Sequence, residues 1–129
     1  MEPSADITGY LQKFLDQFDF LEAILISVEG VESFVATKKE ELQEKREGAT
    51  RFFISAVTQS QQYFTKLNQT GIKSVTIIVD KYNLYMESWP NKIYLSIYCA
   101  IDANLAMVKT IANELKLSFA KMNEKPEKN

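Results

Sequence analysis

The stretch IKSVTIIVDKYNLYMESWPNKIYLSIYCA, from Ile72 to Ala100, decides the fold because it contains three runs typical of β-strands. β-Branched and aromatic residues, which favour a half-buried sheet, recur in these runs. Turn-forming residues separate the runs at Asp80–Asn83 and at Pro90-Asn91. Short connections cannot make the crossover that parallel strands need, so the runs are predicted to be antiparallel neighbours. The predicted strands are Ile72–Val79, Leu84–Trp89 and Ile93–Ala100.

The residues before this stretch predict a helix followed by a β-hairpin. Apolar residues recur at three- and four-residue spacing across Ile7–Phe18, which indicates an amphipathic helix, and Ser4 is its expected N-cap. The runs Leu21–Ser27 and Glu32–Thr37 are expected to be strands joined by a tight turn at Glu29-Gly30.

Two more helices complete the predicted order α-β-β-α-β-β-β-α. Ala49–Leu67 is expected to be a helix that ends before Gly71, and Asp102 or Asn104 is expected to cap a last helix that ends near Met122. A hairpin and a meander together favour an α+β fold, with a central five-stranded antiparallel sheet and helices on its faces. The last helix should bury a stripe of apolar residues: Leu105, Val108, Ile111, Ala112, Leu115, Phe119 and Met122.

A charged segment, Lys38–Gly48, separates the predicted hairpin from the second helix. It contains four basic and four acidic residues. This composition favours a solvated loop or a frayed helical extension, and the alternative is a docking segment for a charged partner.

Length and composition favour one soluble domain. With 129 residues the chain can bury a core, and we expect residues 1–122 to form a single domain and residues 123–129 a disordered charged tail. The net charge of −2 offers no basic surface for nucleic acid. No run is long and apolar enough to span a membrane, and no signal peptide is expected. The only cysteine, Cys99, cannot form an internal disulfide, which favours an intracellular location.

The sequence lacks the residues that most catalytic sites need. It contains no histidine, which excludes histidine-based triads, general bases and metal ligands, and a single cysteine excludes the usual zinc sites. Glycine-rich phosphate loops and nucleophile elbows are absent. The carboxylate pairs Glu40-Glu41 and Asp80/Glu87 are more typical of a solvated run and an exposed turn than of catalysis. Cys99 is more typical of a small core residue than of a reactive thiol. We therefore expect no enzyme, cofactor or metal.

Four aromatic residues gather on two of the predicted strands. Tyr94 and Tyr98 alternate on one face of the last strand, with Tyr85 and Trp89 on the strand before it. Such residues can stack nucleic-acid bases. Because no basic residues lie between them, the pattern favours a face packed beneath a helix.

The second helix and the strand after it predict association with another chain. The helix carries apolar residues over an arc wider than one sheet face needs, and the strand has no charge across Ser74–Val79. An apolar strand at a sheet edge invites pairing with another chain. The alternative is a monomer in which the strand is buried and the helix is covered on both sides.

This layout resembles the roadblock/dynein light chain superfamily, and within it the MEK-partner scaffold subunits of the Ragulator complex. The resemblance covers roughly Tyr10–Met122 and is most specific in Ser96–Leu115, which aligns without a gap to the last strand and helix of those subunits. The matching residues are Ser96, Ala103, Asn104, Glu114 and Leu115 there, with similar apolar residues at Met107, Val108 and Ile111, and Gly30, Val31, Lys73, Ser74, Tyr82 and Asn83 upstream.

Three features depart from the pattern of those subunits. Glu32 stands where a proline usually follows the first hairpin turn, Ala106 stands where a glycine is expected, and the charged Lys38–Gly48 segment is unlike the family's. Both a divergent Ragulator subunit and another roadblock subunit therefore remain open.

The resemblance implies a non-enzymatic scaffold that forms a heterodimer with a second roadblock-fold subunit. The heterodimer would belong to a pentameric assembly on the cytoplasmic face of late endosomes, lysosomes or the vacuole, held there by a lipidated partner, and would be cytosolic when free. That assembly anchors Rag GTPases for amino-acid signalling to the target of rapamycin (TOR) kinase. The same heterodimer scaffolds MAP kinase signalling.

The resemblance also implies how the partner is bound. Members of the superfamily dimerise through the long helix and the strand after it, so the edge Ile72–Val79 is expected to pair with the partner's equivalent strand. A Thr76→Pro substitution should remove a ladder donor and abolish pairing. The expected contact residues are Phe53, Val57, Ser60, Gln61 and Phe64 on the helix and Ser74, Thr76 and Ile78 on the strand.

Two other classes of function remain open. One is a homodimeric roadblock protein or a dynein light chain-type adaptor, and a dynein role predicts binding to intermediate-chain peptides. The other is a ligand-sensing domain of the PAS or GAF type, which requires an enclosed pocket and a bound small molecule.

Overall fold

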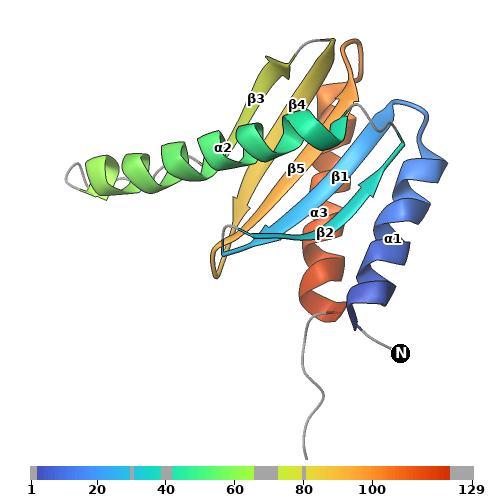
Figure 1. The fold of residues 1–129 in the computed structure, drawn as a ribbon, viewed down its shortest axis with the longest axis horizontal. Coiled ribbons are helices and arrows are strands. Elements are labelled where there is room, and N and C mark those ends of the chain that lie inside the picture. The colour runs from blue at the N-terminus through green and yellow to red at the C-terminus, as the bar shows by residue number, and fades with distance from the viewer. Residues whose placement is uncertain (1–2, 30, 39–41, 66–72, 80, 123–129) are drawn as a thin grey trace, which may run out of the picture.

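The computed structural model describes residues 3–29, 31–38, 42–65, 73–79 and 81–122 (Figure 1). These residues form three helices and five strands in the order that the sequence predicts. The helices are α1 (Pro3–Gln17), α2 (Leu42–Thr65) and α3 (Leu105–Met122), and the strands are β1 (Leu21–Val28), β2 (Val31–Thr37), β3 (Ser74–Val79), β4 (Tyr82–Trp89) and β5 (Ile93–Ala100).

The five strands form one antiparallel sheet in the order β2-β1-β5-β4-β3. The N-terminal hairpin and the C-terminal meander meet where β1 pairs with β5, from Leu21↔Cys99 to Val28↔Ile93. This leaves β2 and β3 at the two edges of the sheet. Helix α2 connects these edges by running across one face of the sheet (Figure 1).

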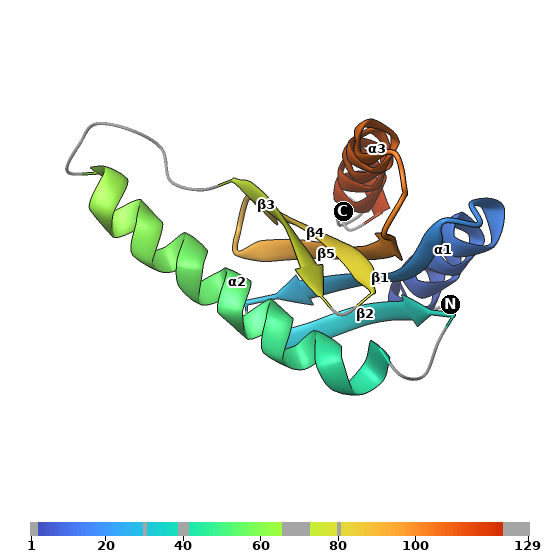
Figure 2. The same cartoon turned by 90° about the horizontal axis from the view of Figure 1, so that it is seen from above.

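Helices cover both faces of the sheet, as predicted. Figure 2 shows α2 on one face and α1 and α3 on the other. The residues of each strand alternate between these faces because successive side chains of a strand point in opposite directions. In β1, for example, Ile24 and Ile26 pack under α1 and α3, whereas Ala23 and Leu25 pack under α2.

The two hydrophobic layers are built from the predicted stripes. Helix α3 buries five of the seven predicted residues, Val108, Ile111, Ala112, Leu115 and Phe119, and the other two are partly buried. On the opposite face, Tyr94 and Tyr98 are buried beneath α2 with Tyr82. This confirms the packed-face interpretation of the aromatic strands and removes them as an exposed stacking platform.

Asn104 is the N-cap of α3. Its side-chain Oδ1 accepts hydrogen bonds from the backbone N–H groups of Ala106 at 2.9 Å and Met107 at 3.3 Å. These are the N2 and N3 positions, whose amides have no partner inside the helix. Of the two predicted caps, Asn104 is therefore correct and Asp102 is not.

Two other predicted element boundaries are wrong. Helix α1 begins at Pro3, so Ser4 lies inside the helix and is not its cap. Proline fits the first turn of a helix because its missing N–H would have no helical partner there. Strand β4 begins at Tyr82, two residues before the predicted start, because Tyr82 and Asn83 pair with β3 and β5 instead of forming the turn.

The charged segment takes one of its two predicted forms, the helical extension, in its described part. Leu42–Gly48 is the first part of α2, so the loop alternative is wrong for these residues. Its Leu, Gln, Glu, Lys and Arg residues all have good helix propensity, although they show no apolar period. Residues 39–41, and the predicted helix end at Leu67 and Gly71, lie outside the described residues.

Two hairpin turns are joined at one end of the sheet. The backbone N–H of Glu29, between β1 and β2, donates to the carbonyl oxygen of Lys92, between β4 and β5, at 2.8 Å. Asn91 and Lys92 in the second turn both have a positive φ, of 67° and 60°, a conformation that asparagine adopts more readily than most residues. Among the described residues, no helix is long and apolar enough to cross a membrane.

Candidate functional site

Within the described part of the chain, strand β3 is an edge strand that pairs with β4 on one side alone. Its register runs without a shift from Ser74↔Glu87 to Val79↔Tyr82. The carbonyl oxygen of Lys73 accepts a hydrogen bond from the backbone N–H of Ser88 at 2.8 Å, so the backbone groups of Lys73 point toward β4. Because these groups alternate in direction along a strand, three residues of β3 point theirs toward the open side: Ser74, Thr76 and Ile78.

The opposite edge, β2, has features that discourage pairing. The β1–β2 ladder shifts register between Ile26 and Ser27, which leaves Ser33 without a ladder partner. The Ser33 hydroxyl donates to the carbonyl oxygen of Val31 at 3.0 Å, and Glu32 adds a charge. Bulges and charges are the usual means by which an edge strand avoids other chains. Strand β3 has neither a register shift nor a charged residue.

Helix α2 is held on the sheet by two of the residues expected to contact a partner. Phe53 and Val57 are each 1% exposed and pack against the sheet within the chain. The ring of Phe53 meets the edge of Tyr94 with 6.1 Å between ring centroids. These two positions therefore anchor α2 to its own sheet, and the outward surface of the helix comes from their neighbours.

The remaining helix positions of the predicted contact set lie in the second half of α2. Ser60 is half-buried, and its hydroxyl donates to the carbonyl oxygen of Val57 at 2.9 Å. Gln61 and Phe64 lie in the helix, but their side chains are outside the described part of the chain. Both views show this half of α2 extending past β3, beyond the end of the sheet (Figures 1 and 2). The helix thus provides a surface on which a sheet continued from β3 would rest.

The strand positions of the contact set face away from α2. Val75 and Ile77 pack toward α2, so Ser74, Thr76 and Ile78 lie on the side of α1 and α3. Ile78 is 70% exposed there. The predicted helix and strand residues therefore lie on opposite faces of the sheet, with Phe53 over the central strand β5, and β3 offers a partner mainly backbone groups.

Sequence analysis missed one exposed residue of α2, Phe52. It is 61% exposed, although it lies beside the buried Phe53. The wide apolar arc of the helix was the available signal, but it did not indicate which of the two rings faces the sheet.

Glu87, expected only as part of an exposed turn, is a carboxylate held by hydrogen bonds on the face of the sheet opposite α2. Glu87 accepts hydrogen bonds from the Tyr85 hydroxyl at 2.5 Å and from the Trp89 indole N–H at 2.7 Å. Burial, the hydrogen bond to Glu87 and its negative charge raise the pKa of Tyr85, and a hydrogen bond with Ser74 opposes this rise. The signal was the spacing of the three residues at every second position of one strand, which places them on one face.

The described residues offer no chemistry for catalysis beyond what the sequence indicated. Cys99 is fully buried, and burial followed by the charge of Glu22 raises the pKa of its thiol to about 11. The thiolate, which is the reactive form, is therefore suppressed at neutral pH. Asp80, the second member of the carboxylate pair with Glu87, lies outside the described residues. Within the described ranges, no group of His, Cys, Asp or Glu residues is arranged to hold a metal ion.

The fold occurs in several solved structures, one of which is a roadblock/LC7 domain. The chain resembles MglB of Myxococcus xanthus with a TM-score of 0.75 and 11% identity over 94% of this chain and 97% of that one. It resembles the gliding protein MglB of Thermus thermophilus with a TM-score of 0.72 and 13% identity, covering 95% and 91% of the two chains. A roadblock/LC7 domain of Streptomyces avermitilis matches with a TM-score of 0.67 and 9% identity, covering 89% and 92%. No family model and no curated protein sequence matches. The fold is therefore roadblock-like.

Proposed function

We propose that the chain is a non-enzymatic scaffold subunit that pairs with a second roadblock-fold protein through β3. The observation that carries this proposal is the contrast between the two edges of the sheet. One edge carries a register shift and Glu32, whereas β3 is regular and uncharged along Ser74–Val79. An unprotected strand edge promotes aggregation of a free chain, but in a subunit it can serve as the contact surface for the partner.

In the proposed dimer, the partner's strand extends the sheet of this chain. The outward backbone groups of Ser74, Thr76 and Ile78 supply the ladder hydrogen bonds, and alternate side chains contact the partner on each face. The second half of α2, which extends past β3, packs along the join. Ser60, Gln61 and Phe64 remain the proposed helix contacts, and we add Phe52 because of its exposure.

The more specific proposal is a Ragulator-like scaffold on late endosomes or lysosomes. It would anchor Rag-type GTPases for amino-acid and TOR signalling, scaffold MAP kinase signalling and reach the membrane through a lipidated partner. Its support is the resemblance across Ser96–Leu115. The structure is compatible with that alignment, because Asn104 caps α3 and Val108, Ile111 and Leu115 are buried in the core.

Co-purification of the tagged chain from native cells tests this proposal. Recovery of a second roadblock-fold protein together with Rag-type GTPases, identified by mass spectrometry, is the expected result. A Thr76→Pro variant of the same tagged chain is the control, and it should lose both. Recovery of dynein chains would be consistent with the roadblock-like fold, but it would show that the function is that of a dynein adaptor and not of a Ragulator-like scaffold. A monomeric native mass with neither partner would refute the scaffold proposal.

A homodimer is the second candidate, since solved MglB, a neighbour in fold, has been found with a tetrameric arrangement. That neighbour covers 95% of this chain at 14% identity with a TM-score of 0.73. Native mass spectrometry of the purified chain distinguishes the candidates. Twice the chain mass favours a homodimer, and a mixed mass after co-expression with the recovered roadblock protein favours the heterodimer.

A further inference from the structure

The sheet has an uncovered area on the face opposite α2, beside β3. Figure 2 shows α3 above β5 and β1, and none of the three described helices lies above β3. Ser74 and Ile78 are exposed in this area, and Thr76 and Glu87 are half-buried. We define the uncovered ledge as these four residues together with Tyr85.

A fixed carboxylate lies on this ledge. Tyr85 and Trp89 each donate a hydrogen bond to a different oxygen of Glu87, which fixes the carboxylate in one orientation. The Trp89 ring is itself held by Phe119 of α3, with 5.7 Å between their centroids. Both donors to Glu87 are uncharged, so neither of them supplies a counter-charge to the carboxylate that they hold in position. Glu87 is already ordered by its two donors, so a cationic group can bind it without the entropy cost of fixing this side chain.

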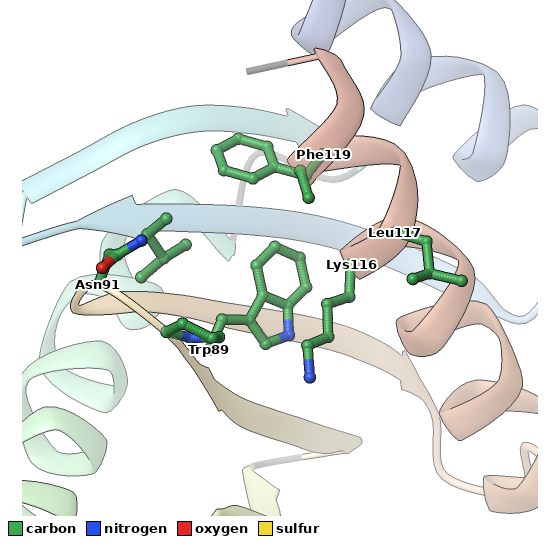
Figure 3. A pocket seen from close by; sticks show the side chains of 8 residues that line it. Trp89, Asn91, Lys116, Leu117 and Phe119 are labelled. Atoms are coloured by element: carbon green, nitrogen blue, oxygen red, sulfur yellow. The ribbon is translucent and has the colours of Figure 1, made fainter. Parts of the chain in front are cut away.

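An apolar hollow of about 350 Å³ lies next to this carboxylate. It opens between the β4–β5 hairpin and α3, and Figure 3 shows Trp89 and Phe119 within it, with Lys116 extending beside the indole ring. Leu117 on its rim is 64% exposed. The lining residues are Trp89, Pro90, Asn91, Ile93, Lys116, Leu117, Phe119 and Ala120.

We propose that the uncovered ledge and this hollow together bind a segment of a partner protein that carries a basic residue next to an apolar one. Trp89 belongs to both parts, because its N–H donates to Glu87 while its ring lines the hollow. The positive charge of Lys116 disfavours a basic side chain inside the hollow. The apolar residue therefore enters the hollow, and the basic residue reaches Glu87 from the side of β3. The ledge shares Ser74, Thr76 and Ile78 with the proposed dimer edge. The dimer uses their outward backbone groups, whereas the segment lies on the face of the sheet that their side chains form.

The chain contains a built-in reporter for this test. Trp89 is the only tryptophan, so its indole N–H gives a single, unambiguous NMR signal next to Glu87. The probe is the capped tripeptide Leu-Arg-Leu, titrated into the ¹⁵N-labelled full chain. The matched peptide has citrulline in place of arginine, which keeps the shape and removes the charge. A third peptide has glutamate at that position.

We expect the arginine peptide to shift the indole signal saturably, and the citrulline peptide to bind about tenfold more weakly, as the loss of a charge-assisted hydrogen bond predicts. The Glu87→Gln variant should lose the same discrimination while keeping the hydrogen bond that Trp89 donates. Leu117→Ser should weaken binding of the arginine peptide. Met107 is an exposed apolar residue elsewhere on α3, and Met107→Ser should leave this binding unchanged. Equal binding of the arginine and citrulline peptides, tighter binding of the glutamate peptide, or no shift at all would overturn the proposal.

Discussion

Phe52 and Phe53 are neighbours in the sequence and lie in opposite environments, with the first 61% exposed and the second 1% exposed. One turn of α2 thus presents one ring to solvent and inserts the other into the layer beneath the helix. The first is available to a partner, and the second holds the helix in place.

Substitution of these two residues should separate stability from association. Phe53→Ala removes a buried ring and should lower the free energy of unfolding by about 3–5 kcal/mol. Phe52→Ala should leave it within about 0.5 kcal/mol, as is usual for an exposed site. Chemical denaturation measures both. In the proposed dimer, Phe52→Ala should instead weaken pairing, and an unchanged dimer dissociation constant would remove Phe52 from the contact set.

Thr76→Pro should abolish pairing with little damage to the chain's own sheet. The backbone N–H of Thr76 points to the open side of β3, so proline removes a donor that β4 does not use. Size-exclusion chromatography with light scattering reports the change in mass. Val75→Pro is the matched control, because the N–H of Val75 points toward β4 and its loss should disrupt the sheet itself. Retention of the dimer by the Thr76→Pro variant would show that β3 is not the contact edge.

Removal of the N-cap of α3 should lower the free energy of unfolding by a modest amount, and another capping residue at the same position should restore most of it. Asn104→Ala eliminates the acceptor for the amides of Ala106 and Met107 and should lower the free energy of unfolding by about 1 kcal/mol. Asn104→Asp keeps a capping oxygen and should recover most of this loss. Thermal unfolding of the three proteins gives the comparison. Equal melting temperatures for the alanine variant and the parent chain would contradict the capping role.

Cys99 should make the chain less stable as the solution becomes more alkaline. Burial raises the pKa of its thiol from the ordinary value of 9.0 to about 11, so the unfolded chain releases this proton at a lower pH than the folded chain. The stabilisation is complete below pH 9 and is lost as the pH rises toward 11. The shift corresponds to roughly 2–3 kcal/mol. The free energy of unfolding should therefore change less between pH 8 and pH 11 for Cys99→Ala than for the parent chain. An equal change in both proteins would show that ionisation of Cys99 is not the cause.

The elements with a clear local pattern were the ones that the sequence predicted well. The run Ile93–Ala100 is apolar or aromatic at most positions because β5 is buried on both faces, and the helical period from Val108 to Phe119 follows from one buried face of α3. The helical start of α2 was only one of the two forms predicted for Leu42–Gly48, because these residues favour a helix but have no apolar period. A segment without an apolar period gives no local signal that separates a helix from a loop.

The candidate site was only partly predictable for a related reason. That β3 forms an edge followed from the element order, and the strand order confirms it. Which residues of α2 face outward depends on how the helix is rotated on the sheet, so Phe53 and Val57 could not be separated from Phe52 in advance. The spacing of Glu87 and Trp89 places them on one face of β4, but the hydrogen bond between them depends on side-chain orientation, which spacing does not supply.

The pairing of β1 with β5 has a consequence for synthesis and folding. It joins Leu21–Val28 to Ile93–Ala100, so the centre of the sheet closes between segments that are far apart in the chain. Contacts of this kind slow folding, because a long loop must be ordered before they form. On the ribosome, β1 and β2 emerge well before β5 does, and the inner edge of β1 stays exposed in the meantime. The growing chain therefore passes through a stage with an additional open strand edge, at which premature pairing with other chains is a hazard that the finished sheet avoids.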